Sequence, residues 1–267
     1  MQNARRHSGK PMAVSVGSFL ATGKEALKLE LIAGASGLEH RIIEAAINRP
    51  GLALSGFFQY FAHRRIQVVG LAEHEYLRSL TSEERESRLQ AFFEKRVPCV
   101  VVTRHKKVFP EIVRLGEATQ TPVLRTHMIT KHFINAATMI MENLMAPRTV
   151  AQGTMVEIMG IGVLIEGKAG MGKSETALGL IKKGHALVSD DVTALRLDAS
   201  GALIGSPVNV TRYHMEIRGL GVIHVPSLFG VSSVRSEKKL DFVATLCEPE
   251  TRDDEDRSAV GSRTVEL

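Results

Sequence analysis

A phosphate-binding loop constrains the fold of this 267-residue chain more than any other feature of its sequence. Residues 167–174, GKAGMGKS, match the pattern G-x-x-x-x-G-K-[ST] at every fixed position. The apolar run at residues 163–165 predicts a buried strand before the loop, and Ala177, Leu178 and Ile181 give the following segment one apolar helical stripe. Strand, glycine loop and helix therefore occur in the order that the motif requires, which argues against a chance match.

The residue types in this loop are those that bind the phosphates of a nucleotide. Glycines let the backbone turn successive N–H groups toward phosphate oxygens, and the N-terminus of the next helix adds a partial positive charge. We expect Lys173 to contact the terminal phosphates and the hydroxyl of Ser174 to bind magnesium. The predicted nucleotide-binding residues are Gly167, Lys168, Ala169, Gly170, Met171, Gly172, Lys173 and Ser174.

Two carboxylates end the next predicted strand, which starts at Ala186. They are Asp190 and Asp191, and we expect them beside the loop because ligands of open α/β sheets bind at the carboxyl ends of strands. Side chains alternate across a strand, so one aspartate should face the phosphates, and the other has either a capping or metal-binding role or a catalytic one. An acidic strand directly after the loop helix resembles a kinase more than a GTPase or a helicase.

Length and composition indicate two domains and no membrane-spanning segment. The first ten residues, MQNARRHSGK, lack the apolar core of a signal peptide, so we expect a cytoplasmic protein. The net charge of +5 is mild, and no basic patch with interleaved aromatic residues is present, which argues against nucleic acid and suits ATP and an acidic protein partner. Cys99 and Cys247 lie in apolar runs, and we expect both to be buried free thiols.

The first part of the chain alternates predicted strands and helices, which indicates an α/β domain. Thr81 followed by Glu84 has the form of a capping box, and Pro147 ends the last helix, so we place a boundary between domains of residues 1–147 and 148–267 there. We interpret His63, His74 and His105 as surface histidines without the spacing of metal ligands. Strands are expected at residues 27–31, 66–70, 100–103 and 122–124, helices at 81–93 and 128–145, and a loop at 49–56.

The second domain contains two predicted hairpins besides the loop. Residues 155–159 should pair with the strand before the loop across residues 160–162, and residues 193–203 should form a hairpin around the turn at 198–201. Glu216 and Arg218 flank Ile217 in an otherwise apolar, glycine-bearing segment. Such charges are either exposed or functional, and the segment by itself favours exposure.

Several segments taken together carry a resemblance. In the second domain they are GKAGMGKSETAL, LVSDDV, EIRGLGVIHV and VRSEKKL, and in the first NRPGLALSG, RRIQVVGLAEHEYL and TPVLRT. With these segments the chain resembles the HPr kinase/phosphorylase family over nearly its whole length. The resemblance implies an α/β N-terminal regulatory or assembly domain, followed by a P-loop kinase domain, and a hexameric assembly.

The resemblance also implies an activity and the residues that perform it. The family phosphorylates a serine of the phosphocarrier protein HPr with ATP or pyrophosphate, reverses this by phosphorolysis, and so controls carbon metabolism. By this likeness Lys173 holds phosphates, and Ser174 and Glu216 bind Mg²⁺ or Mn²⁺. Asp191 is the base toward the serine and the acid in the reverse reaction, and Arg257 is the catalytic arginine.

Two departures from the family pattern bear on the reverse reaction. Gln152 stands where the family has a histidine, and the chain ends at Leu267, before the family's later proline, glycine and arginine segment, so we expect a catalytic domain that is incomplete at its C-terminus. Two other functions stay open. They are a small-molecule P-loop kinase, although no lid or second-substrate motif is visible, and a weakly catalytic regulatory ATPase.

Overall fold

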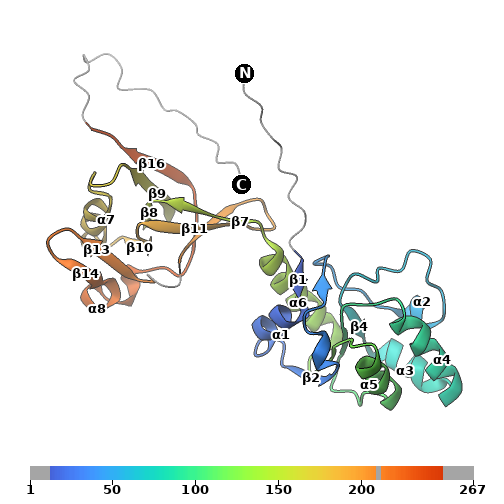
Figure 1. Ribbon diagram of the computed structural model, residues 1–267. Helices are drawn as coiled ribbons and strands as arrows, with labels where there is room; N and C mark the ends of the chain where they lie inside the picture. Colours follow the sequence, from blue (N-terminus) through green and yellow to red (C-terminus); the bar gives the residue numbers. More distant parts are fainter. Residues whose placement is uncertain (1–12, 209–211, 249–267) are drawn as a thin grey trace, which may run out of the picture. The chain divides into compact units, whose positions relative to one another are not determined.

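The computed structural model describes residues 13–208 and 212–248, which form two compact units, Met1–Met145 and Ala146–Leu267 (Figure 1). Both units mix helices and strands, which confirms the predicted α/β class. Within the described residues, no helix is both long enough and apolar enough to cross a membrane.

The first unit is built on a four-stranded sheet in the order β2-β6-β5-β4. Strands β4, β5 and β6 run parallel, and β2 is antiparallel to β6. The strands are β2 (Leu29–Ala33), β4 (Gln67–Val69), β5 (Val100–Val102) and β6 (Val123–Thr126), and a separate small ladder joins β1 (Val14–Ser15) to β3 (Arg41–Ile42). The helices are α1 (Val16–Gly23), η1 (Ala35–Gly37), α2 (Gly51–Leu54), α3 (Leu71–Ser79), α4 (Ser82–Phe93), α5 (Pro110–Ala118) and α6 (Thr130–Met145).

Helices cover both faces of this sheet. The side chains of β5 alternate between two cores, because Val100 and Val102 pack with α3, α4 and α5, whereas Val101 packs with α1 and α6. All three valines are buried, as expected for a parallel strand enclosed on both faces. Because β4, β5 and β6 run parallel, the loops that follow them all leave the sheet at the same edge.

The predicted capping box at the start of α4 is confirmed. The backbone N–H of Glu84 donates to Thr81 Oγ1 at 3.2 Å, and the backbone N–H of Thr81 donates to Glu84 Oε2 at 3.0 Å. The predicted loop at residues 49–56 is wrong in part, because α2 begins at Gly51. The short helices α1, α3 and α5 were not predicted either.

The expected solvent exposure of two side chains, His74 and Cys247, is wrong. His74 was interpreted as a surface residue, but it is buried, and its Nε2 lies 3.1 Å from the carbonyl oxygen of Lys107. Cys99 is buried as predicted, and burial raises the pKa of its thiol to about 12, so the thiol stays protonated. Cys247 is exposed, because it follows the last strand and lies outside the core.

The second unit contains two four-stranded sheets and a hairpin. One sheet has the order β10-β8-β9-β16, and the other β15-β12-β11-β7. The first consists of β8 (Thr154–Ile158), β9 (Ile161–Gly167), β10 (Ala186–Ser189) and β16 (Phe242–Leu246). The second consists of β7 (Arg148–Gln152), β11 (Val192–Leu197), β12 (Leu203–Pro207) and β15 (Lys238–Lys239), and the hairpin of β13 (His214–Ile217) and β14 (Gly221–His224).

Both hairpins predicted for this unit are confirmed. Strand β8 pairs antiparallel with β9, and β11 pairs antiparallel with β12. The sequence did not predict that β16 lies parallel to β9 on its other side. Helix α7 (Lys173–Lys182) packs on this sheet through Ala177, Leu178 and Ile181, and α8 (Val225–Phe229) and η3 (Val231–Ser233) follow the hairpin.

Candidate phosphoryl-transfer site

The phosphate-binding loop joins the end of β9 to the start of α7, as the sequence predicts (Figure 1). Gly170 and Gly172 have φ values of 82° and 83°, in the left-handed region that side chains other than glycine rarely adopt. Gly172 is the N-cap of α7, and no side chain caps this helix. The first amides of α7 are therefore left for an anionic group, as in other phosphate-binding helix N-termini.

The ammonium group of Lys173 lies inside the curve of the loop. Its Nζ donates to the carbonyl oxygen of Gly167 at 3.1 Å and to that of Lys168 at 3.4 Å. These contacts hold the positive charge among the same backbone groups that the motif uses to surround phosphates. The position agrees with the role predicted for Lys173, which stays a prediction.

A single buried carboxylate joins the loop to two strands. Asp190 Oδ1 accepts hydrogen bonds from Thr154 Oγ1 at 2.7 Å and from Ser174 Oγ at 3.0 Å. Asp190 Oδ2 accepts from the backbone N–H of Glu216 at 3.2 Å. Asp190 therefore fixes β8, the start of α7 and β13 around one point, and its side chain is the member of the aspartate pair that contacts the loop serine.

The second aspartate occupies a different kind of position. Strand β10 ends at Ser189, and Asp191 is the middle residue of a tight turn in which the N–H of Val192 donates to the carbonyl oxygen of Asp190 at 2.7 Å. Asp191 has a φ of 61° and is exposed. The expected alternation across a strand is therefore wrong, because a turn separates the two carboxylates.

The residue in the place of the family histidine lies next to this turn. Gln152 is an exposed residue at the end of β7, and it is directly opposite Val192 in the ladder between β7 and β11. The N–H of Gly153 donates to the carbonyl oxygen of Asp191 at 2.8 Å. Gln152 and Asp191 are thus on adjacent strand ends, and the site of the replacement borders the candidate base.

Glu216 combines an anchored backbone with an exposed side chain. Its neighbours Met215 and Ile217 are buried, so the alternation along β13 places the Glu216 side chain on the exposed face. The hydroxyl of Ser174, the carboxylate of Asp190 and the carboxylate of Glu216 are all oxygen donors, which Mg²⁺ prefers. Their chemistry fits the predicted magnesium site, whereas Arg257, the predicted catalytic arginine, lies outside the described residues.

Sequence reasoning missed the two residues that organise this site. It left open which aspartate faces the loop, and it gave Thr154 no role, although Thr154 is fully buried and bonded to Asp190. The available signal was a hydroxyl directly before the apolar pair Met155 and Val156, since a buried hydroxyl requires a hydrogen-bond partner. The partner itself is 36 positions away and follows from the pairing of β8 with β10.

Comparisons with known proteins identify both parts of the chain. The family model described as HPr Serine kinase N terminus matches residues 16–141, and the one described as HPr Serine kinase C-terminal domain matches residues 143–267. An HPr kinase/phosphorylase of Leptospira biflexa is 40% identical over 243 residues, which cover 90% of this chain and 76% of that protein.

Two further relatives with the same name show similar agreement. The protein of Bacillus cereus is 39% identical over 83% of this chain and 72% of its own length, and that of Caldicellulosiruptor bescii is 38% identical over 82% and 71%. A solved Hpr(Ser) kinase/phosphatase from Coxiella burnetii is 38% identical, with a TM-score of 0.38 over 40% of this chain and 65% of that chain. At that TM-score the superposition adds nothing to the fold argument, which the two family models carry.

Proposed function

The chain belongs to the HPr serine kinase family, and we propose that it transfers a phosphoryl group from ATP to a serine of the phosphocarrier protein HPr. The observation that carries the proposal is the arrangement around Asp190, which binds Ser174 and the backbone of Glu216. It joins the loop serine to the backbone of the strand that carries Glu216, and the turn at Asp191 follows directly. Such an arrangement suits phosphoryl transfer, because that reaction depends on positioning and on cations near the phosphates.

In this proposal the loop residues 167–174 hold the phosphates, and Lys173 supplies positive charge to the transferred group. Ser174 and Glu216 would hold Mg²⁺, or Mn²⁺ in its place, and the ion would neutralise charge on the phosphate oxygens when bound. Arg257 is proposed as a further cationic residue of the site.

Asp191 is the proposed base. Its carboxylate accepts the proton of the attacking serine hydroxyl as the serine oxygen bonds to the γ-phosphorus and the bond to ADP breaks. In the reverse direction inorganic phosphate attacks phosphoserine, Asp191 returns the proton to the serine oxygen, and pyrophosphate is released. The exposure of Asp191 supports this choice over Asp190, because a serine on another protein can approach an exposed carboxylate, whereas Asp190 is buried and already bonded.

Incubation of the purified chain with HPr and γ-labelled ATP tests the proposal. Label on a serine of HPr is the expected result. Label transferred to a metabolite would indicate a small-molecule kinase, and hydrolysis without transfer would indicate a regulatory ATPase, so either result would overturn the proposal. Addition of phosphate to labelled phospho-HPr tests the reverse reaction separately, with pyrophosphate as the expected product. The hexamer implied by the resemblance is also a proposal, which sedimentation analysis would test.

A further inference from the structure

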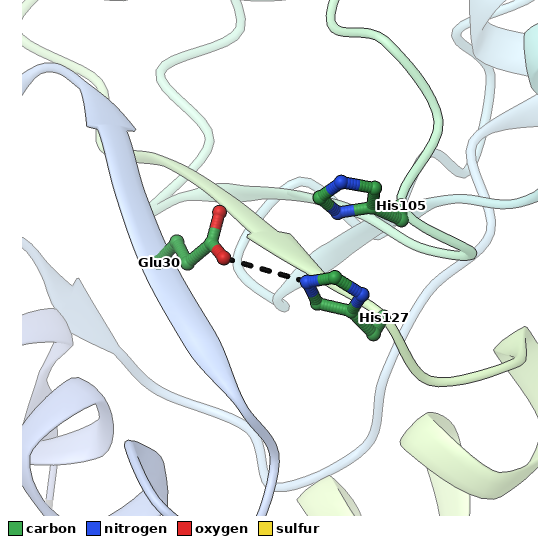
Figure 2. A group of neighbouring side chains, drawn as sticks. All are labelled: Glu30, His105 and His127. Atoms are coloured by element: carbon green, nitrogen blue, oxygen red, sulfur yellow. Dashed lines mark ion pairs between the residues drawn. The ribbon is translucent and has the colours of Figure 1, made fainter.

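A group of metal-ligating side chains lies in the first unit, whereas the phosphate-binding loop belongs to the second. Figure 2 shows that the side chains of Glu30, His105 and His127 face one another at one edge of the sheet. One ligand atom of each residue can be chosen so that all three atoms lie within 4.8 Å of one another. His105 is exposed, as expected for a surface histidine, but the expectation that it stands apart from other possible metal ligands is wrong. The group was invisible in the sequence because its members are far apart along the chain.

The backbone brings these residues together through three adjacent strands. Glu30 lies in β2, opposite Arg125 in β6, and His127 follows the end of β6. His105 follows the end of β5, the parallel neighbour of β6. The group therefore occupies the carboxyl edge of the parallel strands, which is where ligands bind in open α/β sheets.

The loop after β5 is held against the end of β6 in an uncommon conformation. The N–H of Arg104 donates to the carbonyl oxygen of Met128, and that of His105 to the carbonyl oxygen of Thr126, both at 2.9 Å. Arg104 and His105 have φ values of 62° and 50°, so two successive residues other than glycine adopt the left-handed region. Strained residues of this kind occur preferentially at ligand sites, and here the strain positions the His105 ring over His127.

The side chains leave one carboxylate oxygen and the imidazole nitrogens for a common ligand. The rings of His105 and His127 are stacked with centroids 3.8 Å apart, and His127 Nε2 lies 3.5 Å from Glu30 Oε1. Arg125 occupies the other oxygen, Oε2, with contacts of 2.6 and 3.0 Å. The hydrogen bond from Arg125 also holds the pKa of the Glu30 carboxyl below its usual range, so this group is ionised at neutral pH.

We propose that Glu30, His105 and His127 form a binding site for a divalent transition-metal ion, with Zn²⁺ as the ion tested. Two imidazoles and one carboxylate are a common ligand set for Zn²⁺ and its neighbours, and Mg²⁺ prefers oxygen ligands alone. Ligands of a tetrahedral zinc ion at about 2.1 Å are roughly 3.4 Å apart. To bind one ion, the two exposed imidazole rings must turn out of their parallel stacking so that a nitrogen of each points at the ion. Arg125 acts as the outer group that orients the carboxylate.

Bound metal would join the loop after β5 to β2 and β6. These segments come from distant parts of the sequence, so a shared ion connects them only when the unit is folded. Binding to the folded state alone raises stability in proportion to the logarithm of metal concentration over Kd. The ion would therefore rigidify the edge of the first unit.

The test is calorimetric titration of the tag-free, metal-free full chain with Zn²⁺, followed by the absorption spectrum with Co²⁺ as a probe of ligand geometry. We expect one zinc site in the parent, and in His105→Asn and His127→Gln we expect its affinity for zinc to fall at least about 100-fold or to be lost. Removal of a group that only orients a ligand can already lower metal affinity by this much, and removal of the ligand itself should lower it no less. Glu30→Gln is a third variant, and circular dichroism will show whether it stays folded without its Arg125 pair.

Matched controls separate this site from other metal-binding groups. His132→Gln removes an exposed histidine of α6 outside the group, and Glu216→Gln removes the proposed magnesium ligand, so both variants should keep the zinc site. His224→Asn tests the other close histidine pair, His214 and His224. Zinc binding that is unchanged in His105→Asn and His127→Gln, or that is lost in His224→Asn instead, would overturn the proposal.

Discussion

Replacement of Asp190 by asparagine tests whether this carboxylate organises the site. Asparagine preserves the shape of the side chain but exchanges one acceptor oxygen for an amide donor. With its oxygen toward Thr154 and Ser174, its amide faces the backbone N–H of Glu216, so one donor opposes another. In the opposite orientation Glu216 keeps its acceptor, but the hydroxyl proton of the fully buried Thr154 loses its own.

Either orientation leaves one donor without an acceptor, which is the part-buried N–H of Glu216 or the buried hydroxyl of Thr154. An unsatisfied buried donor costs about 1–3 kcal/mol. For a unit of this size each kcal/mol lowers the unfolding midpoint by about 3–5 °C. We therefore expect Asp190→Asn to lower the unfolding temperature of the second unit by roughly 3–15 °C. We also expect it to weaken magnesium binding, because neither orientation of the amide keeps all three hydrogen bonds that join Thr154, Ser174 and the backbone of Glu216.

Asp191→Asn is the matched control, because it makes the same chemical change at the next residue. Asparagine tolerates a φ of 61° as well as aspartate does, and within the described residues no hydrogen bond or ion pair involves the Asp191 side chain. Its stability should stay within about 0.5 kcal/mol of the parent. Phosphoryl transfer should nevertheless be abolished, since an amide cannot accept the serine proton.

Thermal unfolding followed by circular dichroism measures the stability part. The transition of the second unit is identified as the one that ATP with magnesium raises. Transfer of label to HPr measures the catalytic part in the same preparations. An Asp190→Asn variant that unfolds at the parent temperature would refute the hydrogen-bond argument, and an Asp191→Asn variant with normal transfer would refute the assignment of the base.

Four further expectations concern other residues. Lys173→Ala should abolish transfer with little change in stability, measured by label transfer and thermal unfolding, because among the described residues its ammonium donates to loop carbonyls and to no other group. Excess chelator should stop the reaction, and Glu216→Gln should raise the magnesium concentration needed for half-maximal rate; activity that persists in chelator would contradict the metal site. Gln152→His should make the ratio of forward to reverse rate depend on pH between about 5.5 and 8.5, since histidine titrates in that range and glutamine does not, and an equally flat profile would refute this. The pKa of Glu157 is lowered chiefly by its hydrogen bond from Lys238, so the ionised carboxylate stabilises the fold. Glu157→Gln should therefore lower the free energy of unfolding of the second unit by about 1 kcal/mol at pH 7, measured by urea unfolding. This difference from the parent should shrink as the pH falls below about 4.5, because the carboxylate of the parent is then protonated.

The sequence predicted those parts of the fold that depend on neighbouring residues. The strand, loop and helix around residues 163–182 follow from local periodicity and glycine placement, and the start of α4 follows from Thr81 and Glu84. The short helices of the first unit were missed for a physical reason. Helix α5 has Pro110 at its first position and buried Ile112 and Leu115 three positions apart, but two such residues in nine positions fit a short buried loop or strand as well as a helix.

Contacts between distant residues could not be predicted in the same way. Asp190 meets Thr154 and Glu216 because β8 pairs with β10 and the β13–β14 hairpin packs beside them, and no local pattern encodes that register. Glu30 and His127 are close for the same reason, through the pairing of β2 with β6. Residue types identify candidate ligands, whereas strand order decides which of them share a site.

The positive φ of Asp191 gives the side chains of the two neighbouring aspartates different surroundings. Had β10 continued through Asp191, the two carboxylates would project to opposite faces of one sheet. The turn at Asp191 instead ends β10 and starts β11 in the other sheet, so Asp190 stays buried among its hydrogen-bond donors while Asp191 is exposed. A residue with a positive φ costs of order 1 kcal/mol unless its surroundings hold it, and the bonds from Val192 and Gly153 to the carbonyl oxygens of the pair do so. The strained turn thus allows one carboxylate to build the site and leaves the other available to a protein substrate.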